Sequence, residues 1–218
     1  MNRRLIWVAL YAIAMAFVEA AVVVYLRALL DATPVDRIPG VEIAREAATI
    51  VMLLAVGVLA GGELRERFLV FCLAFGIWDL SYYAWLRVLL GWPPSLLTSD
   101  ILFLIPVPWV APVLAPVIVS VGLVAGSLWL LALRARGAML HFPGWIWVLA
   151  AGGGALVLLS FTLDYRLVLQ GHEPPAFRWP LFGSGVAVGA AALVAGVRSL
   201  PGRPPESRNV ATESAPRR

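Results

Sequence analysis

Five carboxylates lie within or at the ends of stretches that are apolar enough to cross a lipid bilayer. They are Glu19, Glu46, Asp79, Asp100 and Asp164. A carboxylate in hydrocarbon is costly, and membrane proteins that keep several use them in ion or proton paths, as reactive groups or as ties between helices. The chemistry to consider first is therefore the handling of a proton, a cation or a small solute inside a membrane.

The depths of these acids can be compared from the rise of a helix. Glu19 precedes Arg27 by eight residues and Asp79 precedes Arg87 by eight, so each acid should lie about 12 Å below the membrane surface on which those arginines lie. Glu46 falls near the start of its span, and the other two acids fall near the ends of theirs. We expect all five to gather in one half of the membrane.

Helical periodicity also places polar groups on common faces. Glu42, Arg45, Glu46 and Thr49 follow i, i+3, i+4, i+7 spacing, which puts them on one stripe of a helix. Arginine suits pairing with buried acids because its planar fork matches a carboxylate.

A second polar face follows in the sequence WDLSYYAWLR, where an acid is flanked by two phenols. The predicted polar pocket combines the two faces with neighbouring charges: Glu19, Glu42, Arg45, Glu46, Asp79, Tyr82, Tyr83, Arg87 and Asp100. Arg45 and Arg87 are the expected counter-charges.

Three functions remain open for this cluster. It could carry an ion, a proton or a small solute from the outer face, with Glu19 and Asp79 as relay or coordinating acids. It could act on a lipid or headgroup at the outer face, with Glu46 or Asp79 as general base and Arg45 or Arg87 holding an anion. It could instead be a set of ion pairs that fastens the helices of a structural or accessory subunit.

The residue types argue against several cofactor sites. The pocket acids offer only oxygen ligands, and they lack the spacing of a known metal motif, so we expect no metal and no cofactor. Cys72 is the single cysteine, and His141 and His172 fall in loops on opposite faces of the membrane. The basic residues are arginines at span ends, as membrane topology requires, and we expect no nucleic-acid partner.

Composition sets the fold class in which these residues must be positioned. The chain has 218 residues, of which 61% are hydrophobic and 14% are charged, and its mean hydropathy is +0.87. A soluble domain usually carries about 25% charged residues. We therefore predict an all-α, multi-pass membrane bundle over residues 1–198 with membrane lipids as its surroundings. The expected spans are 5–30, 41–60, 68–90, 101–133, 144–164 and 181–197.

The fourth of these segments should be broken. Residues 101–133 are too many for one upright helix across about 30 Å of hydrocarbon. Pro106 and Pro108 remove backbone donors and disfavour helix before them. We predict a short dipping or interfacial piece over Ile101–Pro108, with the break at 106–108, and a helix from about Trp109 that Pro112 and Pro116 bend.

Arginine asymmetry predicts the orientation. With six spans and the N-terminus inside, eleven arginines fall on the inside and six on the outside, which favours both termini in the cytoplasm of a bacterial-type inner membrane. Residues 199–218 are rich in Pro, Ser and Arg and should form a disordered cytoplasmic tail.

Glycines with GxxxG spacing predict close helix contacts. The pairs are Gly57 with Gly61, Gly122 with Gly126, and Gly185 with Gly189. Packing within the chain is the first interpretation of these pairs. Assembly into a homo-oligomer or a larger membrane complex through the same faces is the alternative.

Overall fold

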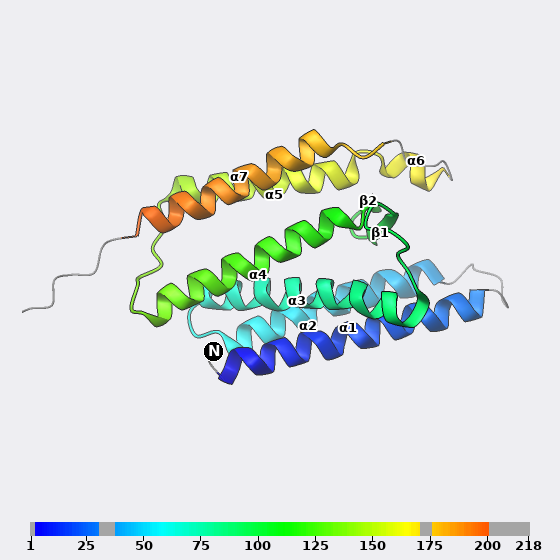
Figure 1. Cartoon of the computed structure of the whole chain (residues 1–218), viewed down its shortest axis with the longest axis horizontal. Helices are drawn as coiled ribbons and strands as arrows, with labels where there is room; N and C mark the ends of the chain where they lie inside the picture. The colour runs from blue at the N-terminus through cyan, green and yellow to red at the C-terminus, as the bar shows by residue number, and fades with distance from the viewer. Residues whose placement is uncertain (1–2, 31–37, 171–175, 201–218) are drawn as a thin grey trace, which may run out of the picture.

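The chain forms long helices with one small hairpin between them (Figure 1). A computed structural model describes residues 3–30, 38–170 and 176–200. In chain order its elements are α1 (Arg3–Leu30), α2 (Ile38–Ala60), α3 (Leu64–Leu90), β1 (Ser99–Phe103), β2 (Trp109–Pro112), α4 (Leu114–Ala135), α5 (Gly144–Thr162), α6 (Tyr165–Leu169) and α7 (Trp179–Arg198). Six of the described helices, all except the short α6, are long and apolar enough to cross a membrane. The predicted all-α membrane bundle is confirmed.

Helix α3 is the centre of the larger part of the bundle, since it packs against α1, α2 and α4. Small residues on α1 make the α1–α3 approach close: Ala12, Ala16 and Ala20 recur every fourth position and are fully buried. Helices whose facing residues are small can bring their backbones together and gain dispersion contacts, which is the main attraction available inside lipid. Val70 and Leu73 of α3 fill this core.

Helices α5 and α7 form a second pair, which Figure 1 shows as a separate layer beside α4. A Cβ atom added to Gly153 would lie 2.7 Å from Gly189 N and 2.8 Å from Gly185 O, so the two backbones are in contact. Gly57 of α2 faces α3 in the same way, with 2.8 Å between an added Cβ and Arg67 O. Two of the three GxxxG pairs therefore serve packing within the chain, and a homo-oligomer through these faces stays a prediction.

The segment between α3 and α4 differs from the prediction. Instead of a dipping piece over Ile101–Pro108 and a helix from Trp109, strands β1 and β2 form an antiparallel hairpin with an irregularity between Ile101 and Phe103. Pro106 and Pro108 explain why no helix forms here, because neither can donate a backbone N–H and each disfavours helix in the residue before it.

Helix α4 consequently begins at Leu114, after Pro112, which is the last residue of β2. Pro116 lies in the first turn of α4, where a missing N–H would have had no partner within the helix. The predicted bending of this helix by Pro112 and Pro116 is therefore wrong, because neither proline lies in the helix interior.

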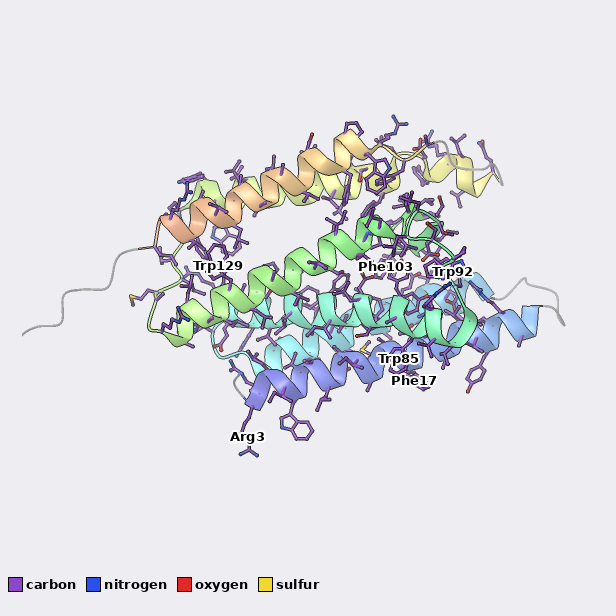
Figure 2. All side chains as sticks on the ribbon, viewed as in Figure 1. Arg3, Phe17, Trp85, Trp92, Phe103 and Trp129 are labelled. Atoms are coloured by element: carbon purple, nitrogen blue, oxygen red, sulfur yellow. The ribbon has the colours of Figure 1, made fainter. Side chains whose placement is uncertain are left out.

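The two ends of the bundle are chemically different. At the end that holds the start of α1, which we call the N-terminal end, Arg4 pairs with Glu66, and Arg134 pairs with Glu63 at 3.0 Å. These ion pairs tie α1, α3 and α4 together. The opposite end, which we call the hairpin end, carries β1 and β2 (Figure 1). Phe103 and Trp92 lie at this end, whereas Trp85 and Phe17 meet along the side of α1 and α3 (Figure 2).

Candidate functional site

A polar pocket of about 260 Å³ lies between α1, α2, α3 and β1, toward the hairpin end of the bundle. We call it the acidic pocket. Its lining includes seven of the nine residues that the sequence predicts for the site: Glu19, Glu42, Arg45, Glu46, Asp79, Tyr82 and Tyr83. The acids come from three helices, and Glu19, Glu46 and Asp79 are only 4%, 8% and 7% exposed. The structure thus brings these seven side chains together around one cavity.

Arg45 joins α2 to α1 through Glu19 and also pairs with Glu42 of its own helix. Its guanidinium pairs with Glu19 and also with Glu42, the latter at 2.8 Å. The Thr49 hydroxyl donates a hydrogen bond to Glu19 as well. The stripe of polar residues on α2 therefore faces α1, and the positive charge of Arg45 is shared between two carboxylates.

Glu46 faces the hairpin instead of Arg45. The backbone N–H of Leu104 donates a hydrogen bond of 2.8 Å to Glu46 Oε2. Leu104 directly follows β1 and precedes the proline-containing connection. Its N–H therefore takes no part in the hydrogen bonds between β1 and β2. Glu46 is thus held by a neutral donor from an irregular segment, which is tolerated at membrane depth where it lines a cavity.

Asp79 is held by α4. The Ser120 hydroxyl donates a hydrogen bond of 2.8 Å to Asp79 Oδ2. A close approach of α3 and α4 makes this contact possible, since a Cβ added at Gly76 would lie 2.7 Å from Ser120 O. Gly76 precedes Asp79 by one helical turn, so the glycine and the acid act on the same face.

Asp100 lies next to the acidic pocket rather than in its lining. It accepts a hydrogen bond of 3.0 Å from the Tyr83 hydroxyl, and so connects β1 to α3. Asp100 is outside the six spans. Burial raises the pKa of its carboxyl to about 6, against the lowering effects of the Tyr83 and backbone hydrogen bonds.

Aromatic rings of Trp78, Tyr82, Tyr83 and Phe103 also line the acidic pocket. Trp78 and Tyr82 stack with their ring centroids 6.0 Å apart, and Tyr82 meets Tyr83 edge-on at 5.4 Å. Phe103 of β1 contacts Trp78 from the hairpin side. The indole N–H of Trp78 is buried without a hydrogen-bond acceptor. A buried donor of this kind is costly unless something in the pocket accepts from it.

One predicted counter-charge, Arg87, and one acid of the sequence pattern, Asp164, lie outside the acidic pocket. Arg87 does not face the pocket acids, because its guanidinium donates to the carbonyls of Gly91 and Pro93 after the end of α3. Asp164, the fifth acid of the sequence pattern, pairs with Arg178 at 3.0 Å. The rise of a helix predicts how deep a residue lies in the membrane, but not its position around the bundle. The sequence pattern therefore grouped Asp164 with the other four acids.

The charges of the acidic pocket do not balance. As far as the described residues go, its lining carries the carboxylates of Glu19, Glu42, Glu46 and Asp79 but a single arginine, Arg45. Among the described residues, no cation lies within ion-pair distance of Glu46 or Asp79. In that same part of the chain, no group of three or more His, Cys, Asp or Glu side chains has the geometry to hold a metal ion. The pocket therefore offers uncompensated negative charge and hydroxyl groups.

Sequence reasoning missed two of the groups that hold these acids. Ser120 is a small hydroxyl residue within an apolar span, and its seven-residue spacing from Ser127 was the available signal for a polar face on α4. The Leu104 backbone N–H had no side-chain signal at all.

The chain was compared with protein-family models, with curated proteins and with solved structures, and none of the three comparisons finds a match. What this chain can do is therefore inferred from the acidic pocket itself.

Proposed function

We propose that this chain is a multi-pass membrane protein of the transporter class, which takes a proton or a small cation into the acidic pocket. One observation carries the proposal: Glu46 and Asp79 share a cavity, both are buried, and both are held only by neutral donors. Binding of a proton or a cation stabilises a carboxylate in that position, because either one removes the cost of an unpaired buried charge.

The geometry supports this function better than it supports a purely structural role. A scaffold would pair each of its buried acids and leave no polar cavity. Interhelical polar contacts in membranes contribute only about 0.6 kcal/mol on average, so one hydroxyl or one amide is small compensation for a buried charge. Arg134 with Glu63 fastens helices at the N-terminal end, away from the acidic pocket. Arg45 with Glu19 fastens α2 to α1 inside the pocket, but Glu46 and Asp79 take part in no such pair with any described residue there.

An enzyme acting on a lipid headgroup is less well supported. That chemistry needs an arginine available to hold the phosphate or another anion of the substrate. Arg45 is the one arginine that lines the pocket in the described part of the chain, and it is already paired with Glu19 and Glu42. Arg87, the other candidate, is bound to backbone carbonyls.

Arginine asymmetry supplies the direction of uptake. If both termini are cytoplasmic in a bacterial-type inner membrane, the hairpin end faces outward and the acidic pocket lies in the outer half of the membrane. The core residues Ala12, Val70 and Leu73 lie on the N-terminal side of the pocket. A transported ion must therefore wait for a rearrangement of this packing, as alternating access requires.

The test is ion flux in liposomes that contain the purified full-length chain. A pH-sensitive dye trapped inside reports proton entry after the outer solution is acidified, and trapped sodium or potassium dyes report those cations. We expect the wild type to admit at least one of the three ions, and Asp79→Asn and Glu46→Gln to reduce its flux by tenfold or more, which corresponds to about 1.4 kcal/mol in the limiting step.

Asp164→Asn is the matched control, since it removes an acid that lies outside the acidic pocket. It should keep the flux of the wild type. Absence of flux for protons, sodium and potassium would contradict the proposal, and so would equal losses in all three variants. Melting temperatures in detergent identify any variant that has lost its fold.

A further inference from the structure

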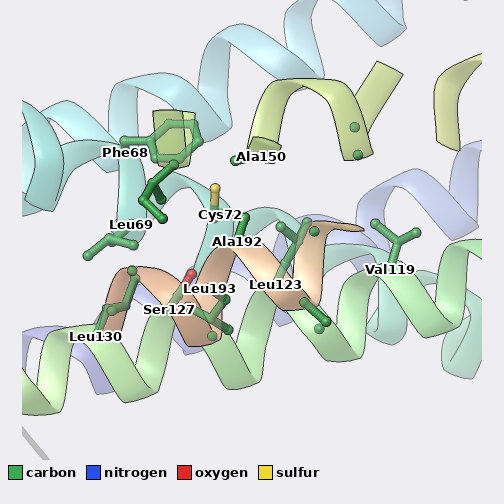
Figure 3. A pocket seen from close by; sticks show the side chains of 18 of the residues that line it. Phe68, Leu69, Cys72, Val119, Leu123, Ser127, Leu130, Ala150, Ala192 and Leu193 are labelled. Atoms are coloured by element: carbon green, nitrogen blue, oxygen red, sulfur yellow. The ribbon is translucent and has the colours of Figure 1, made fainter. Parts of the chain in front are cut away.

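A second and larger cavity, of about 530 Å³, separates α3 and α4 from the α5–α7 pair (Figure 3). We call it the apolar cavity. Phe68 and Leu69 of α3, Leu123 of α4 and Leu193 of α7 project into it in Figure 3. Its volume falls in the range of about 300–1,000 Å³ that small-molecule and cofactor sites occupy.

Glycines keep this space open. A Cβ added at Gly122 of α4 or Gly154 of α5 would meet no heavy atom within 4 Å, although both residues line the cavity. Helices α5 and α7 cannot move apart to fill the cavity without losing the backbone contact that they make at Gly153. Helix α7 meets α4 where Leu193 approaches Gly126, at 3.2 Å from an added Cβ.

Water is a poor occupant of such a cavity. A buried water needs two to four polar partners, and large cavities lined by Leu, Ile and Phe stay dry. The side chains that bring polar atoms or sulfur to the lining are those of Arg65, Cys72, Ser127 and Trp147, and the rest of the lining is hydrocarbon, aromatic ring or glycine. In a chain that spans a membrane, the apolar molecules at hand are the acyl chains of lipids.

The positive charge at one end of the apolar cavity favours a lipid with an anionic headgroup. Arg65 lines the cavity at the N-terminal end, where its guanidinium donates to Leu140 O at 2.8 Å and lies 3.4 Å from His141 Nδ1. No carboxylate of the described residues lies within ion-pair distance of it. Arg198 follows Gly196, a lining residue, at the exposed end of α7. Arginine donors are well matched to phosphate oxygens, and basic pockets between transmembrane helices hold anionic headgroups.

From these observations we propose that the apolar cavity is a phospholipid-binding site, in which one acyl chain lies between α4 and the α5–α7 pair and the phosphate lies at Arg65. The bound lipid completes the packing between the two parts of the bundle. This site is separate from the acidic pocket and does not depend on the function proposed for it.

Lipid retention tests the proposal. The full-length chain is purified in mild detergent and given an equal mixture of phosphatidylglycerol and phosphatidylcholine, and retained lipid is measured by native mass spectrometry and phosphorus content. We expect the wild type to retain phospholipid and to prefer phosphatidylglycerol. Gly154→Leu, which places a side chain in the cavity, should lower retention several-fold.

Matched substitutions separate the site from general effects. Gly152→Leu makes the same change on the same helix at a position outside the lining, and it should retain lipid as the wild type does. Arg65→Gln should abolish the preference for phosphatidylglycerol, whereas Arg67→Gln, outside the lining, should keep it. No retained phospholipid in the wild type, equal retention in both glycine variants, or a retained molecule without phosphorus would overturn the proposal.

Discussion

Leu104 and Glu46 are 58 residues apart, and the backbone N–H of the first donates a hydrogen bond of 2.8 Å to the carboxylate of the second. This bond joins the residue that follows β1 to α2, and both residues line the acidic pocket. It places a buried acid against a segment that belongs to neither a helix nor a strand. The same contact makes Glu46 both a tie between elements and a charge without a cation, and the two roles can be separated by substitution.

Glu46→Gln should keep the tie and remove the charge, because the glutamine carbonyl can still accept from Leu104 N–H. Glu46→Ala should lose both, and an unpartnered donor costs about 1–3 kcal/mol. We expect the melting temperature in detergent to fall by several degrees for Glu46→Ala and to stay close to the wild type for Glu46→Gln. If both variants lose the same stability, Leu104 does not depend on this acceptor.

Gly153 should tolerate no side chain. Its added Cβ would approach Gly189 N and Gly185 O within 2.8 Å, and both are backbone atoms that cannot turn aside. Gly153→Ala should therefore separate α5 from α7, at a cost of about 1–3 kcal/mol that is typical of overpacking.

Gly152 supplies the control for that prediction. A Cβ there meets nothing within 4 Å, and alanine is favoured over glycine in a helix by about 1 kcal/mol. Gly152→Ala should leave the melting temperature unchanged or raise it. Thermal unfolding of both variants in the same detergent makes the comparison, and equal effects at the two positions would show that the α5–α7 contact is not close.

Asp100 should make stability depend on pH. Burial raises the pKa of this carboxyl from 3.8 to about 6 in the folded chain. Between these two values the folded chain keeps the proton while the unfolded chain has released it, so the contribution of Asp100 to stability is complete below pH 4 and is lost as the pH rises through 6. The difference sets an upper bound of about 3 kcal/mol.

Melting temperatures measured from pH 4.5 to 7.5 test this dependence. Asp100→Asn cannot ionise, so the variant should lack the Asp100 share of the decline, and the difference between it and the wild type should grow toward neutral pH. A constant difference across the range would contradict the prediction. Asp164→Asn, at a site that does not touch Asp100, should keep the same decline as the wild type.

The proposed orientation can be tested with single cysteines. Cys72 is buried and is first replaced in a Cys72→Ser background. Ser95→Cys, in the exposed turn before β1, should react with a membrane-impermeant maleimide added outside the cell. Arg136→Cys, after the end of α4, should react only after the membrane is opened. The reverse pattern would place the acidic pocket in the inner half.

Much of this protein follows from local patterns in its sequence. Runs of about 20 apolar residues predict spanning helices because unsatisfied backbone groups cannot lie in lipid. The i, i+3, i+4, i+7 spacing of Glu42, Arg45, Glu46 and Thr49 predicts one polar face because helix geometry is regular. Seven of the nine predicted site residues line the acidic pocket, including Glu42, Arg45 and Glu46 of this face.

Only the tertiary structure decided how the acids are partnered. Arg45 is shared between Glu19 and Glu42, Ser120 holds Asp79, and the hairpin holds Glu46. Helical periodicity gives the direction of a side chain about its own axis, but not which neighbouring helix stands there. Pro106 and Pro108 predicted a break in this segment. The pairing of β1 with β2 was not predicted, because it depends on residues that meet across the turn. Five acids in apolar stretches were visible in the sequence. The imbalance between the four carboxylates and the one arginine that line the acidic pocket among the described residues appeared only when the helices were brought together.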